Sequence, residues 1–233
     1  SMALPLNEVP KYTCSLPSTG QTITYRPFLV KEQKVMLMAM ESEDENEISQ
    51  AVIDTMQSCM VSEIDIKSLP IFDFEYLYLK VRAKSVGETV KLRIKCPDDE
   101  KEIVIKEVNL DELQVDKPKD HTNKIEFEPG YGVVMRYPTA DSFKNYPESS
   151  TALSYKLAQD SIQTIYKGDE VYDRNNISDE ELEEFVNNMT QVQFTKLQAF
   201  FDTMPRIRHT IKYQNPKTGK DFEMKLTGTS DFF

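Results

Sequence analysis

The chain is poor in the residues from which most catalytic and metal sites are built. Its 233 residues include two histidines, three cysteines, seven glycines and no tryptophan. His121 and His209 are far apart in the sequence, so a histidine-based metal or catalytic site is not expected. The sequence also has no glycine-rich phosphate loop and no glycine-flanked nucleophilic serine. We therefore predict that the protein is not an enzyme, with no catalytic residues and no cofactor.

The cysteines also lack the spacing of a disulfide framework or a zinc site. Cys14, Cys59 and Cys96 are an odd, widely separated set, as is typical of free thiols in a reducing cytoplasm. Cys96-Pro97 lies at the tip of a predicted hairpin, where a zinc knuckle would carry its first cysteine, but acidic residues follow instead of a second thiol. A similar hairpin tip at residues 214–219 has no cysteine. We expect no metal, and the hairpin shape is compatible with a zinc-knuckle ancestor.

Long apolar runs and excess positive charge are absent as well. No segment approaches the ~18 apolar residues of a membrane span, and the N-terminus lacks the basic and apolar regions of a signal peptide. Ser1 before Met2 has the appearance of an expression-tag remnant. The net charge of −11 argues against a nucleic-acid partner, because such binding relies on Lys and Arg neutralising phosphates. We expect neither nucleic acid nor a membrane as a partner.

What the sequence does contain is strong helical periodicity. Apolar residues recur at helical spacing in segments that predict helices over residues 30–40, 45–60, 71–85, 151–166, 178–189 and 194–204. The fifth opens with a capping box at Ser178–Glu181, and Pro205 ends the sixth. The aromatic density of residues 71–79 leaves a strand open there. Within that segment, Asp73 and Glu75 are expected on an exposed helix face; burial would raise their pKa values.

Turn residues flanked by strand-like runs predict four hairpins, over residues 12–25, 90–106, 124–137 and 207–226. Helical blocks each followed by hairpins indicate an α+β fold without βαβ units, and the similarity of the hairpins at 90–106 and 207–226 is compatible with a pseudo-duplication. The length fits a single compact protein over residues 1–233. Two intertwined subdomains, about 1–140 and 141–233, remain open.

Flexible and aromatic side chains are the best candidates for partner binding. Met36, Met38 and Met40 alternate along a predicted helix, so they cannot all face one side, and methionine suits adaptable contacts. Phe232 and Phe233 follow Gly228 at the end of the sequence, where two aromatics could anchor the chain in a partner's pocket. Alternatively, the two phenylalanines fold back over the adjacent hairpin.

Several stretches together resemble a known family. They are Leu16-Pro17 with Gly20, Arg26-Pro27-Phe28, residues 31–34, residues 72–77 and 79–87, Tyr137-Pro138-Thr139, residues 194–205 and Asp231-Phe232-Phe233. In order and spacing the chain resembles the baseplate hub assembly proteins of T4-like tailed bacteriophages, particularly those carried by phages of marine cyanobacteria. The resemblance covers nearly the whole chain and rests on the succession of these stretches.

The resemblance implies a late viral protein of the host bacterial cytoplasm. It implies an assembly factor or chaperone that binds phage baseplate hub proteins during tail and virion assembly. The alternative is a permanent structural subunit of the hub, located in the virion baseplate. Homo-oligomerisation is left open. A cell-wall hydrolase is a competing hypothesis, which requires two carboxylates placed ~5–9 Å apart in a cleft.

Overall fold

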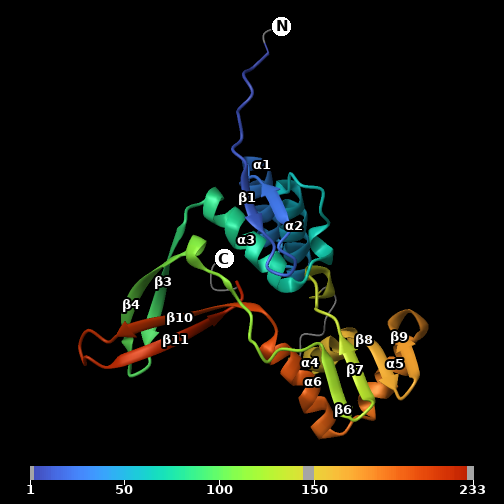
Figure 1. The fold of residues 1–233 in the computed structure, drawn as a ribbon. Helices are drawn as coiled ribbons and strands as arrows, with labels where there is room; N and C mark the ends of the chain where they lie inside the picture. The colour runs from blue at the N-terminus through green and yellow to red at the C-terminus, as the bar shows by residue number, and fades with distance from the viewer. Residues whose placement is uncertain (1–2, 144–149, 230–233) are drawn as a thin grey trace. The chain divides into compact units, whose positions relative to one another are not determined.

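The computed structural model describes residues 3–143 and 150–229, and it confirms the α+β class. The strands form small antiparallel sheets, and the described residues contain no parallel strand pair. The chain divides into two compact units (Figure 1). Unit 1 combines Ser1–Asp116 with Arg206–Phe233, and unit 2 is Lys117–Pro205. The single compact protein with subdomains of about 1–140 and 141–233 stays a prediction.

The described residues of unit 1 form three helices, three hairpins and one short strand. Its elements are β1 (Tyr12–Ser15), β2 (Thr22–Tyr25), α1 (Val30–Glu41), α2 (Glu45–Cys59), α3 (Ile71–Ser85), β3 (Thr89–Cys96), β4 (Asp99–Asn109), β5 (Val115–Asp116), β10 (Arg206–Gln214) and β11 (Asp221–Thr227). Short 3-10 turns occupy Ile66–Ser68 and Leu110–Glu112. Strand β10 pairs with both β11 and β5.

Helix α2 of unit 1 begins at a side-chain cap. Asp44 caps α2 by accepting hydrogen bonds from the backbone N–H groups of Asn46 and Glu47. Helix α3 follows Pro70, and it confirms the helical alternative for this aromatic segment. Leu77, Leu79 and other apolar side chains of α3 are buried, so the helix forms the centre of the unit's core.

The expectation that Asp73 and Glu75 lie on an exposed face is wrong. Both carboxylates are buried, and each has a partner from a distant part of the sequence. Asp73 accepts hydrogen bonds from the backbone N–H and the hydroxyl of Ser18, in the turn between β1 and β2. Arg206 donates to both oxygens of Glu75, at 3.0 and 3.1 Å. These contacts compensate the burial of charge, which is why the core tolerates two acidic residues.

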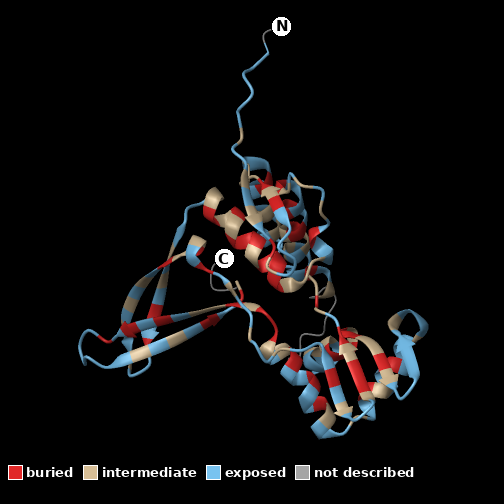
Figure 2. Ribbon diagram, viewed as in Figure 1, coloured by how far each residue is buried: buried red, intermediate tan, exposed pale blue. Residues whose placement is uncertain are grey.

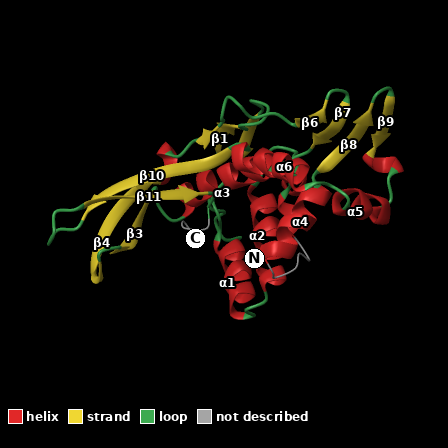
Figure 3. Ribbon diagram, turned by 90° about the horizontal axis from the view of Figure 1, so that it is seen from below, coloured by secondary structure: helices red, strands yellow, loops and turns green. Residues whose placement is uncertain are grey.

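The two long hairpins of unit 1, β3–β4 and β10–β11, lie side by side in both ribbon views (Figures 1 and 3). Side chains alternate along both, with buried Ile94 and Ile211 on inner faces and charged residues on outer faces. Hydrogen bonds join the two tips, from Asn215 and Thr218 of one to Asp98 of the other. The similarity that the sequence shows between these hairpins is therefore matched by a direct association.

Unit 2 places helices against a four-stranded antiparallel sheet. Its elements are β6 (Lys124–Glu128), β7 (Tyr131–Met135), α4 (Ser150–Asp160), β8 (Ile162–Lys167), β9 (Glu170–Asp173), α5 (Asp179–Asn187) and α6 (Gln191–Thr203), with 3-10 turns at Ala140–Phe143 and Arg174–Asn176. The strand order is β6-β7-β8-β9. Val133 and Ile162 from the sheet and Leu182, Leu197 and Phe200 from the helices share one hydrophobic core.

One predicted helix in unit 2 is too long. Residues 151–166 were expected to be helical throughout, but α4 ends at Asp160 and β8 begins at Ile162. Ile162, Thr164 and Ile165 are β-branched residues, which fit a pleated sheet better than a helix. Strand β7 supplies the pairing partner, with Val133 opposite Ile165. Because that partner lies some thirty residues earlier in the sequence, helical periodicity alone does not reveal it.

Candidate functional site

Helix α1 leaves most of its apolar side chains in solvent. It packs along α2 through a narrow face that carries the buried Glu32 and the half-buried Met36 and Ala39. Its other sides expose a set that we call the α1 surface: Val30, Val35, Leu37, Met38 and Met40. Figure 2 shows α1 largely in the colour of exposed residues. Burying one such side chain contributes roughly 1.5–3 kcal/mol, so a dense exposed set is typical of a contact surface.

A buried polar cluster fixes α1 in place beneath this surface. The guanidinium of Arg26, just after β2, donates to the carboxylate of Glu32 and to the Pro27 carbonyl oxygen at 3.0 Å. The thiol of Cys59, the last residue of α2, lies 4.0 Å from the same carboxylate. Burial raises the pKa of the Cys59 thiol to about 12. The cluster ties α1 to α2 and to the segment after β2, so the α1 surface rests on a fixed support.

The candidate binding residues differ in how far they are exposed to solvent. Met38 is 70% exposed and Met40 is also exposed, whereas Met36 is half-buried on the face toward α2. Phe232 and Phe233 lie outside the described residues. The role of all five as partner-binding residues stays a prediction.

Sequence reasoning missed Val30, Val35 and Leu37. A signal for Val35 and Leu37 is present in the unbroken apolar run of residues 35–40. Six consecutive apolar residues exceed the roughly 100°-wide stripe that a surface helix buries against a core. Some of the run must therefore face solvent or a partner.

The sulfur and imidazole groups have the properties of structural side chains. Burial raises the pKa of the Cys14 thiol to about 11 and also raises that of Cys96, so these thiols stay protonated near neutral pH. His121 lies in unit 2 between Tyr137 and Phe200, where its ring nitrogens contact the hydroxyl groups of Thr203 and Tyr137. His209 is a residue of β10.

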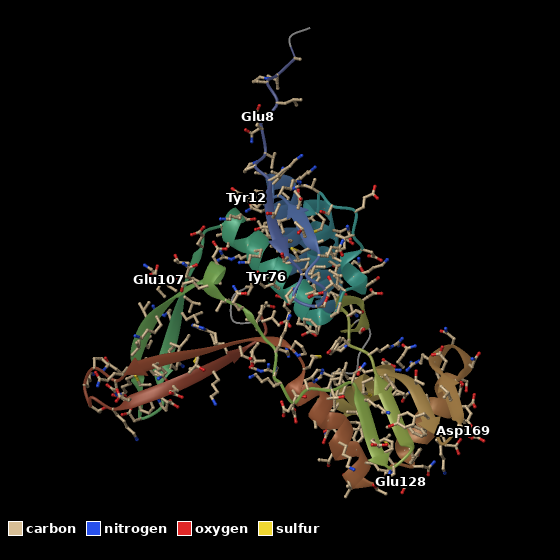
Figure 4. The ribbon with its side chains drawn as sticks, viewed as in Figure 1. Glu8, Tyr12, Tyr76, Glu107, Glu128 and Asp169 are labelled. Atoms are coloured by element: carbon tan, nitrogen blue, oxygen red, sulfur yellow. The ribbon has the colours of Figure 1, made fainter. Side chains whose placement is uncertain are left out.

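A second cluster of unit 1 combines lysines with tyrosines. Lys80 of α3 lies over the ring of Tyr76, and Lys84 lies over the ring of Tyr12 from β1, at 5.2 and 5.0 Å. Both ammonium groups are 3.7 Å from the carboxylate of Asp111. Figure 4 labels Tyr12 and Tyr76. Because Asp111 occupies the space between the two ammonium groups, the cluster holds the 3-10 turn at Leu110–Glu112 against α3.

The hairpin tips are joined by hydrogen bonds. Asp98 accepts from the side-chain amide of Asn215 at 2.9 Å and from the Thr218 hydroxyl at 3.0 Å. The hydrogen bond from Asn215 is the main cause that lowers the pKa of Asp98. Asn215 is fully buried, and its side-chain oxygen accepts from the backbone N–H groups of Lys217 and Thr218. We call this contact the tip clasp.

Across residues 3–143 and 150–229, no three His, Cys, Asp or Glu side chains gather closely enough to hold a metal ion. In the same ranges no helix combines the length and the apolar character needed to cross a membrane. Absence of metal from the protein stays a prediction that elemental analysis would test.

Comparison with known proteins identifies the family. The model of the family described as T4 bacteriophage base plate protein matches residues 9–233. The chain belongs to this family. No curated protein and no solved structure matches it. The family resemblance inferred from the sequence is thus confirmed at the level of a T4-like phage baseplate protein, whereas the cyanobacterial-phage form stays a prediction.

Membership of the baseplate family gives the α1 surface a biological setting. A baseplate protein works among other proteins of the phage particle, so its expected partners are other baseplate proteins. The match extends over both compact units and includes α1 and the long hairpins. The surfaces that these elements expose are therefore surfaces of a baseplate protein.

Proposed function

We propose that this baseplate protein is an assembly factor for the baseplate hub of a contractile-tailed bacteriophage. It acts in the host cytoplasm by protein binding, without a chemical step. The α1 surface carries the proposal, because it gathers exposed apolar side chains on a helix that is fixed by the ion pair between the half-buried Arg26 and the buried Glu32. The family match supports a partner from the same baseplate.

The mechanism follows from the character of the α1 surface. A hub subunit that awaits assembly exposes the apolar surfaces with which it later joins its neighbours. Val35 with Met38 on one exposed side of α1, and Leu37 with Met40 on another, are available to cover such a surface, and the flexible methionines adapt to its shape. The complex prevents premature association until docking of the subunit releases the protein.

A permanent structural subunit of the hub is the second candidate. The same exposed α1 surface favours it, because a subunit that is always bound also shows an apolar interface when it is viewed alone. The two candidates differ in whether the finished virion contains the protein. They agree in predicting that a hub protein binds to α1.

Co-expression with each hub protein of the same phage tests the proposal. We expect one hub protein to co-purify with the unmodified chain and to be lost with Met38→Glu, because a carboxylate would be buried in an apolar interface. Val192→Glu is the matched control, since Val192 is 68% exposed on helix α6 and Met38 is 70% exposed on helix α1.

Circular dichroism of both variants establishes that they are folded. Equal capture of the hub protein by Met38→Glu and Val192→Glu would remove the side of α1 that carries Met38 from the interface. Failure of every hub protein to co-purify with the unmodified chain would reject binding to the hub altogether.

A further inference from the structure

The outer face of the β3–β4 hairpin combines a row of positive charges with a row of apolar side chains. Lys91, Arg93 and Lys95 alternate along β3, so all three point to the same side. On β4, Ile105 stands opposite Arg93, and Ile103 stands opposite Lys95. Ile105 is 56% exposed and Ile103 is 40% exposed. These five residues define the basic-apolar face.

Within the part of the chain that the structure describes, the positive charges of this face have no ion-pair partner. Among residues 3–143 and 150–229, Lys91, Arg93 and Lys95 form no ion pair or side-chain hydrogen bond. Glu107, labelled in Figure 4, stands opposite Lys91 without forming an ion pair. This concentration of positive charge occurs in a chain whose net charge is −11. The face therefore differs from the average surface in the sign of its charge.

The sister hairpin β10–β11 shows what an ordinary outer face looks like in this molecule. Its exposed residues include Lys212 and Glu223, which face each other in register with 3.9 Å between their charged groups. Thr210 and Lys225 form the next outward pair. The exposed outward positions there carry no isoleucine, whereas the outer face of β3–β4 carries two isoleucines and three cations beside Glu107. The outer faces of the two hairpins therefore differ in the side chains that they expose, although both are long antiparallel hairpins of unit 1.

We propose that the basic-apolar face docks an acidic, partly apolar segment of another protein. The rows of neighbouring strands are about 5 Å apart, so one extended segment along the hairpin contacts both rows. Its carboxylates meet Lys91, Arg93 and Lys95, and its apolar side chains cover Ile103 and Ile105. This surface is separate from α1, and the proposal does not depend on the identity of the α1 partner.

The chemistry of the face favours an acidic protein over the other occupants. A nucleic acid would satisfy the three cations but leave the two isoleucines facing phosphates, and the net charge of −11 opposes a polyanion. A second copy that docked its own basic-apolar face here would bring like charges together. An acidic-apolar protein segment satisfies both rows at once.

Fluorescence anisotropy with a labelled peptide of alternating glutamate and valine tests this inference on the full chain. Alternation directs the glutamates to one side of an extended peptide and the valines to the other. We expect binding that weakens with rising salt and that is at least about tenfold weaker in the Arg93→Glu, Lys95→Glu double variant. A peptide of alternating lysine and valine should not bind.

The sister hairpin supplies the matched control. Lys212→Glu with Lys225→Glu makes the same change in net charge at exposed positions of the sister hairpin, and it should leave peptide binding unchanged. Ile105→Ser should weaken binding, whereas Val171→Ser on β9, another exposed strand residue, should not.

Three results would overturn the proposal. They are no binding of the acidic peptide, equal loss of binding in the two charge-reversal variants, and tighter binding of a single-stranded oligonucleotide than of the peptide at the same salt concentration.

Discussion

At the scale of single residues, substitution of Phe194 in α6 tests whether this helix belongs to the core of unit 2. Its side chain is buried and stacks on Tyr155, with 4.8 Å between the ring centroids. We predict that Phe194→Ala lowers the free energy of unfolding by ~3–5 kcal/mol, and that Phe201→Ala costs less because Phe201 is only partly buried. Chemical denaturation measures both. Unchanged stability in the two variants would contradict the placement of α6 in the core.

His121 makes the stability of unit 2 depend on pH. The Thr203 hydroxyl donates to the Ala199 carbonyl oxygen at 2.8 Å, so it accepts from Nδ1–H of His121 and leaves Nε2 to accept from Tyr137. Burial lowers the pKa of His121 below its usual value. Its contribution to stability is therefore complete above pH ~6.5 and is lost as the pH falls through the lowered pKa.

The prediction is that acidification from neutral pH to about pH 5 destabilises the wild-type protein more than it destabilises His121→Gln. Denaturation curves at the two pH values give the difference. If wild type and variant lose the same stability, protonation of His121 is not the cause.

At the scale of elements, the sequence predicts the helices and hairpins whose patterns are local. The capping box at Ser178 is observed, with reciprocal hydrogen bonds between Ser178 and Glu181, and α5 begins there as expected. Strand β8 was not predicted, because its identity depends on pairing with β7. The burial of Asp73 was not predicted either, because its partner Ser18 is 55 residues away in the sequence.

The tip clasp predicts how the two long hairpins support each other. Asn215→Ala removes the amide that binds Asp98 and leaves the backbone N–H groups of Lys217 and Thr218 without their acceptor. We expect a loss of ~1–3 kcal/mol of stability, the usual cost of buried polar groups that lose a partner. Thr210→Ala, on the exposed face of the same hairpin, is the control and should cost little.

Acid titration provides a second measurement on the tip clasp. The pKa of Asp98 is lowered, mainly by its hydrogen bond from Asn215, so this carboxylate stabilises the fold above its ordinary pKa of 3.8. That contribution is lost as the pH falls through the lowered pKa. Asn215→Ala should reduce the acid-dependent part of the stability. Identical acid denaturation of variant and wild type would show that Asp98 does not depend on Asn215.

At the scale of the whole molecule, the sequence predicts the class of protein better than its working surfaces. The scarcity of histidine, cysteine and glycine directs attention to protein binding, and the succession of motifs indicates the baseplate family. The apolar run 35–40 indicates that part of α1 faces solvent or a partner, but which of its side chains do so, and the basic-apolar face, become visible only once burial and register are known.

The composition of purified, infectious phage particles tests the proposed function most directly. An assembly factor binds the hub subunit through the α1 surface and leaves when the subunit docks, so quantitative mass spectrometry should find the protein in infected cells and in baseplate intermediates but not in finished virions. The established tail proteins in the same sample provide the internal standard. A fixed copy number per virion, in constant ratio to those tail proteins, would contradict release and would make the protein a permanent part of the baseplate.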